Sequence, residues 1–234
     1  MKTKDNLDQH FMIDTSILYR IVELANLKPD DIVLEIGPGT GNLTKLLAKK
    51  AKIICVEKDC DISLDIKNTE FHNANVLDVI ETLKFNKIVA NIPFNISEPL
   101  FKKLFKLKFE LAVLTSGMKF YDLLMSEHRF GIVAREFFNI ELIQEIPKSA
   151  FKPRPRVKSA LIKLIPKEND SILKNIILLD DKKLKNAILK AFEGKETKKE
   201  TKEKLKVFNS KTSEKRFWEL NEEEFTQLKV LVVS

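Results

Sequence analysis

Apolar positions in the first two thirds of the chain follow two spacings. The runs Asp31 through Ile36, Lys52 through Val56 and Ile88 through Asn91 are short and rich in β-branched residues, as in strands covered on both faces. Between Asp14 and Ala25 the apolar residues recur at helical spacing, which predicts a helix with Asp14 as its N-cap. This alternation of strands and helices predicts an α/β fold built on a doubly wound sheet.

The same patterns predict the remaining elements of this region. We expect helices over Asn42 through Ala51 and Asp59 through Ile66, and strands over Glu70 through Asn73, Glu110 through Thr115, Gly131 through Gln144 and Val157 through Ile165. The last two strands should form an antiparallel hairpin at an edge of the sheet.

The pattern changes at Pro166. Beyond it we expect only helices, over Ile172 through Leu179, Leu184 through Phe192, Lys198 through Phe208 and Glu222 through Val230. We therefore expect two domains: a Rossmann-like α/β domain at residues 1–166 and a small helical domain at residues 167–234.

Residues suited to ligand binding follow three of the predicted strands. Gly37, Gly39 and Gly41 are three of only six glycines in the protein, and they suit a tight turn pressed against a ligand. Glu57 ends the second strand, where a carboxylate can accept hydrogen bonds from ribose hydroxyls. Asn91 ends the fourth strand. Because parallel strands end at one edge of the sheet, these residues predict a nucleoside-type cofactor lying across that edge.

The segment Asn91-Ile92-Pro93-Phe94 suits a planar base. The Asn91 amide offers an acceptor for an exocyclic amino group, and Phe94 offers a ring for stacking. Pro93 keeps the preceding residue out of the helical region. An ordinary strand-to-helix turn with a core phenylalanine is the structural alternative.

Composition excludes several classes of protein. No apolar run approaches the roughly 18 residues of a membrane span, and the first eight residues are polar, so we expect a soluble, cytoplasmic protein without membrane contact. Cys55 and Cys60, with only three histidines, support neither a disulfide framework nor a metal site.

The net charge of +7 favours a polyanionic partner. From Lys182 through Arg216, thirteen Lys and Arg stand against five Glu, a local excess of +8. A second basic cluster surrounds two prolines and comprises Lys148, Lys152, Arg154, Arg156, Lys158 and Lys163. Contact with nucleic-acid phosphates accounts for both clusters, and a solvated lysine-rich surface is the alternative.

Six motifs, in order from about Asp8 to Pro166, resemble the rRNA adenine N6-dimethyltransferase family, which includes KsgA-type and Erm-type enzymes. They are Gln9-x-Phe11, Glu35-Ile36-Gly37-Pro38-Gly39-Thr40-Gly41, Leu43-Thr44, Glu57, Asn91-Ile92-Pro93-Phe94-Asn95-Ile96-Ser97 and Ala150-Phe151-x-Pro153-x-Pro155-x-Val157-x-Ser159. The resemblance implies an S-adenosylmethionine-dependent methyltransferase domain that acts, as a monomer, on rRNA or an assembling ribosomal subunit.

The resemblance also implies roles for particular residues. Asn91, Pro93 and Phe94 would hold the target adenine, which makes them the candidate catalytic residues. The candidate cofactor-binding residues are Gln9, His10, Met12, Glu35, Gly37, Gly39, Gly41, Glu57, Asn75, Val76 and Asn91. The candidate RNA-binding residues are Lys152, Arg154, Arg156, Lys195, Lys198 and Lys199.

Two departures from the family pattern leave alternatives open. Asn75 stands where the family usually has Asp, and Ser116-Gly117-Met118-Lys119-Phe120 replaces a Gln-Lys-Glu-like segment. We expect N6-methylation or dimethylation of adenine in small-subunit rRNA. The alternatives are Erm-like methylation of large-subunit rRNA, and an rRNA-binding assembly factor with weak catalysis. DNA adenine methylation is disfavoured by the segment at residues 150–155, called the Phe-Pro-Pro segment after Phe151, Pro153 and Pro155, because it resembles the rRNA enzymes.

Overall fold

The computed structural model describes residues 10–233, which fold into two compact units. The first unit contains the chain as far as Met125 together with Phe138–Pro166. The second unit contains Ser126–Phe137 and the chain from Lys167 onward. Within residues 10–233, no helix is both long enough and apolar enough to cross a bilayer.

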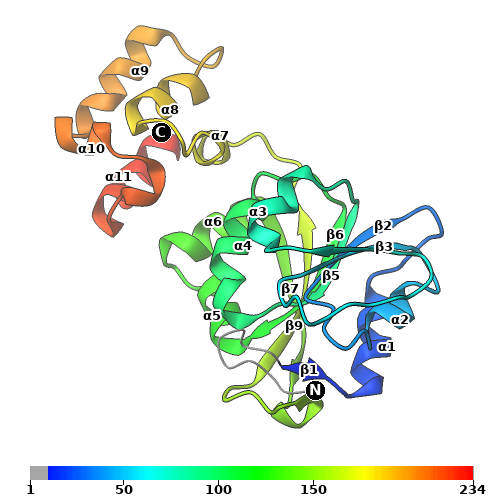
Figure 1. The fold of residues 1–234 in the computed structure, drawn as a ribbon. Coiled ribbons are helices and arrows are strands. Elements are labelled where there is room, and N and C mark those ends of the chain that lie inside the picture. The colour runs from blue at the N-terminus through cyan, green and yellow to red at the C-terminus, as the bar shows by residue number, and fades with distance from the viewer. Residues whose placement is uncertain (1–9, 234) are drawn as a thin grey trace. The chain divides into compact units, whose positions relative to one another are not determined.

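A seven-stranded sheet forms the centre of the first unit (Figure 1). Its strands are β2 (Ile32–Ile36), β3 (Lys52–Glu57), β4 (Thr69–Asn73), β5 (Lys87–Asn91), β6 (Leu111–Gly117), β7 (Phe138–Ile146) and β9 (Ser159–Pro166). Their order in space is β4-β3-β2-β5-β6-β9-β7. Strands β2 to β6 are parallel, whereas β9 runs antiparallel to both β6 and β7. The structure confirms the predicted α/β fold and the antiparallel hairpin at the edge of the sheet.

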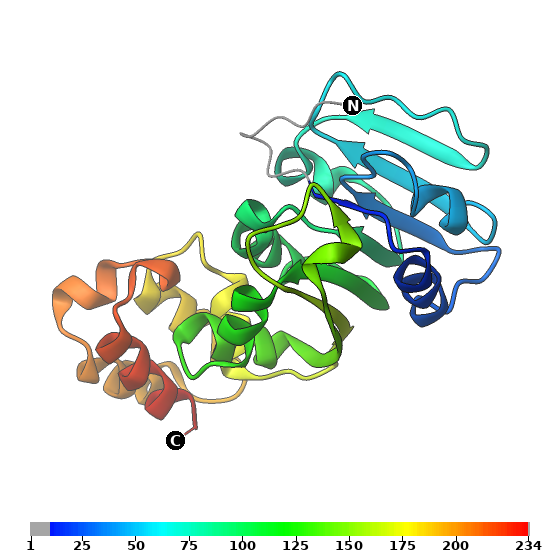
Figure 2. The same cartoon turned by 90° about the horizontal axis from the view of Figure 1, so that it is seen from below.

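Helices cover both faces of this sheet, as Figures 1 and 2 show. On one face, α1 (Thr15–Leu24) and α2 (Thr44–Leu47) pack against inward-facing side chains such as Val33 and Val89. The other face is covered by α3 (Val76–Val79), α4 (Ser97–Leu104) and α5 (Met118–Met125). Burial on both faces explains why these strands are continuous apolar runs.

A two-stranded sheet joins the start of the described chain to the Phe-Pro-Pro segment. Strand β1 (Phe11–Met12) pairs antiparallel with β8 (Phe151–Lys152). The predicted N-cap follows directly, because Asp14 Oδ1 accepts hydrogen bonds from the amides of Ser16 and Ile17, at 3.0 and 3.3 Å. The start of the described chain is therefore tied to the segment between β7 and β9 before α1 begins.

The second unit is helical. Its helices are α6 (Arg129–Phe137), α7 (Ile172–Leu178), α8 (Leu184–Ala191), α9 (Lys198–Lys204), α10 (Ser210–Glu214) and α11 (Glu222–Val233). Phe217 and Phe225 are buried in its core, with ring centroids 6.0 Å apart. Helix α9 begins with a capping box, in which Thr197 and Glu200 satisfy each other's backbone amides.

Three predicted elements differ in the structure. Residues 131–137 form part of α6 and belong to the second unit, because Phe130, Val133, Ala134 and Phe137 are buried at helical spacing. The predicted helix over residues 59–66 is absent, since the amide of Asp61 bonds to the Asp59 carboxylate and makes a turn. The predicted helix over residues 42–51 is limited to α2.

Candidate active site

The main pocket lies at the carboxyl edge of the sheet, where β2 lies between β3 and β5. The chain runs from β2 to one side through β3 and β4, and it returns to the other side at β5. Such a switch point is where open α/β sheets bind ligands. The pocket encloses about 840 Å³, its open mouth included.

The glycine turn after β2 forms one wall of the pocket. Gly37, Gly39 and Gly41 have φ angles of +66°, +53° and +76°, a region that favours glycine. The Gly37 amide donates to the Val56 carbonyl at 2.9 Å, which ties the turn to the next strand. A Cβ at Gly39 would lie 2.5 Å from the Phe11 ring. Gly41 faces Leu64 and Ile66 instead, so it shapes the turn without lining the pocket.

Glu57 is a buried carboxylate at the end of β3. Its Oε2 accepts a hydrogen bond from the Gly39 amide at 3.2 Å, and its Oε1 accepts one from the Asp59 amide at 2.9 Å. Burial raises the pKa of Glu57, and hydrogen bonds from the backbone amides of Asp59, Gly39 and Lys58 oppose that effect. The two oxygens of a carboxylate offer about four lone-pair sites, so the held carboxylate can still accept a hydrogen bond from a ligand.

Glu35 lies deeper than Glu57. Its side chain is 2% exposed, and burial raises its pKa to about 8, with the nearby Glu57 charge adding to the effect. Cys55 Sγ lies 3.9 Å from Glu35 Oε2. Burial therefore favours the protonated form of Glu35 more than that of a surface carboxylate.

The Asn91 side chain is held by the start of the described chain. Its Nδ2 donates to the main-chain carbonyl of His10 at 2.8 Å. Its Oδ1 is buried and accepts no hydrogen bond from the described residues. A buried amide oxygen without a donor costs about 1 to 3 kcal/mol. A ligand that donates a hydrogen bond to this oxygen can recover at most that cost as binding free energy.

Phe94 lies between two other parts of the site. Its ring centroid is 5.9 Å from that of His10, with the planes tilted by 39°. On another side, a Cβ at Gly117 would lie 3.4 Å from the Phe94 ring. Gly117 belongs to the segment that departs from the family pattern, and a Cβ there would be in van der Waals contact with this ring.

Asn75 caps the helix that follows β4. Its Oδ1 accepts a hydrogen bond from the Leu77 amide at 3.2 Å, and the residue lines the pocket together with Val76. One lone pair of this oxygen is therefore used within the protein, and one remains for a ligand.

The pocket gathers most of the predicted residues. Its wall includes His10, Gly37, Gly39, Glu57, Asn75, Val76, Asn91, Pro93 and Phe94. Met12 and Glu35 line a smaller neighbouring cavity, which shares Gly37 and Asn91 with the main pocket. Gln9 lies outside the described residues. Phe11, Lys58 and Asn95 also line the pocket, although none of them was predicted to belong to the site. Phe11 and Asn95 each had a signal in the sequence, Phe11 in the Gln9-x-Phe11 motif and Asn95 in the motif that runs from Asn91 to Ser97.

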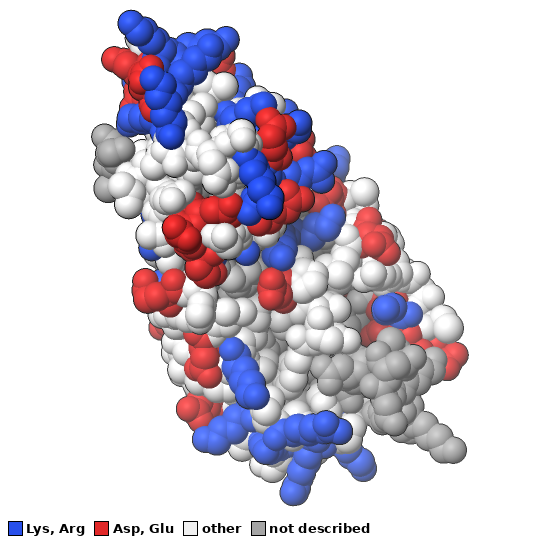
Figure 3. All heavy atoms as spheres, turned by 90° about the vertical axis from the view of Figure 1, so that its left-hand side faces the viewer, with Lys and Arg blue, Asp and Glu red and all other residues white. Residues whose placement is uncertain are grey.

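The predicted RNA-binding residues form two exposed groups. Lys152, Arg154 and Arg156 lie in the segment between β7 and β9, and no ion pair engages them within residues 10–233. Figure 3 shows Lys and Arg side chains gathered at that end of the first unit. In the second unit, Lys195, Lys198 and Lys199 are exposed around the start of α9, and Lys195 pairs with Asp170 at 3.0 Å.

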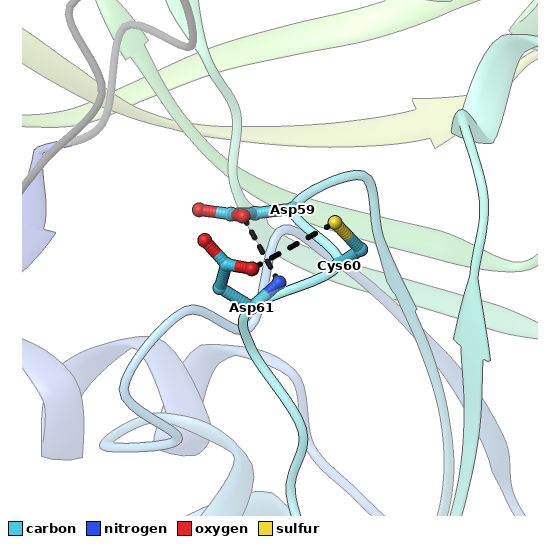
Figure 4. Close-up of side chains that lie close together, drawn as sticks. All are labelled: Asp59, Cys60 and Asp61. Carbon is cyan, nitrogen blue, oxygen red and sulfur yellow. Dashed lines mark hydrogen bonds between the residues drawn. The ribbon is translucent and has the colours of Figure 1, made fainter.

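Asp59, Cys60 and Asp61 place three potential metal ligands within 4.8 Å of one another (Figure 4). Asp59 is buried, and the other two residues are exposed. Cys60 Sγ lies 3.9 Å from the Asp61 carboxylate, and Asp59 accepts the Asp61 amide at 3.2 Å. These bonds show that the three residues lie close together because they form a tight turn after β3.

Comparison with known proteins assigns the whole chain to one group. The family model described as ribosomal RNA adenine dimethylase matches residues 1–226. A Methanococcoides burtonii protein described as a probable ribosomal RNA small subunit methyltransferase A is 36% identical over 207 residues, which cover 78% of this chain and 76% of the relative. A Methanosarcina barkeri protein with the same description is 36% identical over 206 residues, covering 78% and 71%.

Solved structures support the same fold. A dimethyladenosine transferase from Plasmodium falciparum matches with a TM-score of 0.66 and 30% identity, over 94% of this chain and 96% of the other. The 23S rRNA methyltransferase ErmE matches with a TM-score of 0.60 and 21% identity, over 96% and 100%. At that identity, the likeness to ErmE shows the fold alone.

Proposed function

The chain belongs to the ribosomal RNA adenine dimethylase family, and on that premise we propose that it methylates N6 of adenine in small-subunit rRNA, with S-adenosylmethionine as the methyl donor. The observation that carries this proposal is the pocket at the switch point of the sheet. A glycine turn and a buried carboxylate line it together with an amide and an aromatic ring.

The glycine wall fits S-adenosylmethionine. Gly37 lines the pocket without a side chain, and a Cβ there would come no closer than 3.8 Å to a protein atom, so a ligand can approach the backbone closely. Glu57 is held by two amides with lone pairs to spare for ribose hydroxyls. When bound, the cofactor supplies an already activated methyl group. The protein has to bind and orient the cofactor and the target base, and to exclude water from the pocket.

The part of the pocket lined by Asn91 and Phe94 fits an adenine turned out of its stack. Asn91 Oδ1 is a buried acceptor that an exocyclic amino group would satisfy, and Phe94 supplies a face for stacking. Hydrogen bonds from the two amino hydrogens to protein acceptors orient the amino group, so that the nitrogen lone pair points toward the methyl group. The amino nitrogen can release its proton after attack, so the reaction requires no catalytic His or Cys.

Charge on the two units suits RNA. Lys152, Arg154 and Arg156 are exposed on the first unit, and Lys195, Lys198 and Lys199 are exposed on the second. Phosphate contacts of this kind fix position without reading sequence. Base selection then belongs to the pocket.

The choice of small-subunit rRNA rests on the relatives. Both curated relatives described above carry that subunit in their descriptions. The likeness to ErmE extends to the fold alone, so it does not favour large-subunit rRNA.

A methyl-transfer assay tests the proposal. The purified protein is incubated with radiolabelled S-adenosylmethionine and either small-subunit particles or large-subunit RNA, both lacking the modification. We expect label in N6-methylated adenine of the small-subunit RNA. Asn91→Ala should lower the rate by about 100-fold or more, as does removal of a preorganised hydrogen-bonding group in other enzymes.

Asn139→Ala is the matched control, because Asn139 is exposed on β7. Label in large-subunit RNA alone would replace the proposed substrate with the Erm-type one. Measurable RNA binding with no label in either RNA would indicate an assembly factor.

A further inference from the structure

We propose that the N-terminal strap, residues 10–14, and the Phe-Pro-Pro segment, residues 150–155, together set the orientation of the Asn91 amide. The Phe-Pro-Pro segment thereby acts on the active site through the strap, in addition to carrying basic residues. His10 is the positioning residue in this arrangement, and its main-chain carbonyl is the group that contacts Asn91.

An asparagine amide can lie in two orientations that exchange its oxygen and nitrogen. The His10 carbonyl can only accept a hydrogen bond, so at 2.8 Å it selects the orientation that brings Nδ2 toward it. Oδ1 is then the branch left without a donor within residues 10–233. The opposite orientation would place two oxygens together at His10, and it would offer the base a donor where an acceptor is needed.

The position of the His10 carbonyl depends on the Phe-Pro-Pro segment. In the register of β1 and β8, Phe11 pairs with Lys152 and Met12 pairs with Phe151. The Ile13 amide donates to the Ala150 carbonyl at 2.8 Å. His10 Nδ1 lies 3.1 Å from the Pro153 carbonyl, and because a carbonyl only accepts, Nδ1 carries the proton there.

The glycine turn holds the other side of the strap. The Phe11 ring covers Gly39 so closely that a Cβ at Gly39 would lie 2.5 Å from it. Asn42 Nδ2 donates to the Met12 carbonyl at 3.1 Å. The strap therefore links three segments that are distant in sequence: the glycine turn, the Asn91 loop and the Phe-Pro-Pro segment.

Ile13→Pro tests this link with Ile13→Ala as its matched control. Proline removes the Ile13 amide, which makes the shorter of the two hydrogen bonds to the Ala150 carbonyl; the Asp14 amide makes the other, at 3.3 Å. Both variants lose the same half-exposed side chain, and only proline lacks the hydrogen bond. The readout is the Asn91 side-chain amide signal in an NMR spectrum, assigned by its loss in Asn91→Ala.

In Ile13→Pro we expect the Asn91 amide signal to shift toward that of a solvated amide. The rate of methyl transfer at saturating cofactor should fall about fivefold, which corresponds to loss of about 1 kcal/mol of orientation preference. Ile13→Ala should leave both unchanged. An unshifted Asn91 signal in a folded Ile13→Pro protein would overturn the proposal.

The reverse experiment keeps the proposal testable should Ile13→Pro not fold. Asn91→Asp cannot donate to the His10 carbonyl, so the strap should loosen and the Ile13 amide should exchange with solvent at least tenfold faster. The Ile54 amide, in the centre of β3, serves as the internal reference. Unchanged exchange at Ile13 would refute the link.

The catalytic consequence rests on the proposed function, whereas the link itself does not. Both NMR readouts are taken on the protein without RNA. If the NMR readouts respond as expected but the protein transfers no methyl group, the link between the strap and Asn91 is supported and the proposed function is refuted.

Discussion

The two units hold their polar groups in opposite ways. In the first unit, Glu57 and Asn91 are bonded to main-chain groups, so individual atoms have defined positions. In the second unit many charges are exposed and bond to one another, and hydrogen bonds from Lys183 and Lys185 lower the pKa of Glu214 to about 2. The first arrangement suits recognition of particular ligand atoms. The second arrangement attracts a polyanion through its summed charge, so no single side chain is essential.

The largest difference between the units should appear in the unfolding free energy that is lost when an ion pair is broken. Lys87 and Asp31 form a buried pair at 2.8 Å, with side chains 6% and 5% exposed. Lys87→Ala leaves Asp31 buried without its partner and should cost about 3 to 5 kcal/mol of unfolding free energy. Lys195→Ala, which breaks an exposed pair with Asp170, should cost less than about 1 kcal/mol. Urea denaturation of both variants measures these losses, and equal losses would contradict the comparison.

The next largest effect should come from the contact between the Glu57 carboxylate and the cofactor. Glu57→Ala is expected to weaken S-adenosylmethionine binding by about 1.5 to 3 kcal/mol, the range for hydrogen bonds to a charged group. Isothermal titration calorimetry measures the dissociation constant. Glu70→Ala is the matched control, because Glu70 is exposed on β4 and lies outside the pocket. A dissociation constant that is the same for both variants would remove Glu57 from the ribose site.

The buried acid Glu35 gives the first unit a pH dependence of stability. Its pKa rises from about 4.5 when unfolded to about 8 when folded, so the folded state holds its proton more tightly. This contribution is fully present below pH 4.5 and is lost as the pH rises through about 8, at up to about 1.4 kcal/mol per pH unit. Unfolding free energies at pH 5 and pH 8 should therefore differ more for the native protein than for Glu35→Gln. Parallel curves for the two proteins would contradict the assignment.

The smallest effects should come from the basic surface of the second unit. Replacing Lys198 and Lys199 with Glu should weaken RNA binding and reduce the slope of log affinity against log salt, by about 0.7 to 0.9 for each phosphate that the variant no longer neutralises. Lys84→Glu with Lys108→Glu is a charge-matched control, since both lysines are exposed at the amino ends of strands, away from the pocket. Equal reductions in the two double variants would show that only net charge matters.

Much of the site was predictable because each part is local. A strand that ends in glycines, a strand that ends in Glu57 and a strand that ends in Asn91 can each be recognised within a few residues. Parallel strands then bring these ends to one edge. The hydrogen bond between Asn91 and His10 spans 81 residues and has no local pattern, so it was not predicted.

The error at residues 131–137 has a similar origin. Their apolar residues fit both a strand alternation and a helical spacing, and local pattern does not choose between them. Packing within the second unit chooses the helix: the Lys174 ammonium lies 5.1 Å from the Phe137 ring centroid, and the Lys167 amide donates to the Phe137 carbonyl at 2.8 Å.

The sequence alone therefore determined the α/β class, the family resemblance and the residues at the strand ends, because short-range sterics and periodicity control them. The tertiary structure alone decided which main-chain carbonyl meets the Asn91 amide, which ring covers Gly39 and which unit takes residues 126–137. Those outcomes depend on contacts between distant segments, and such contacts form only when the whole core has packed.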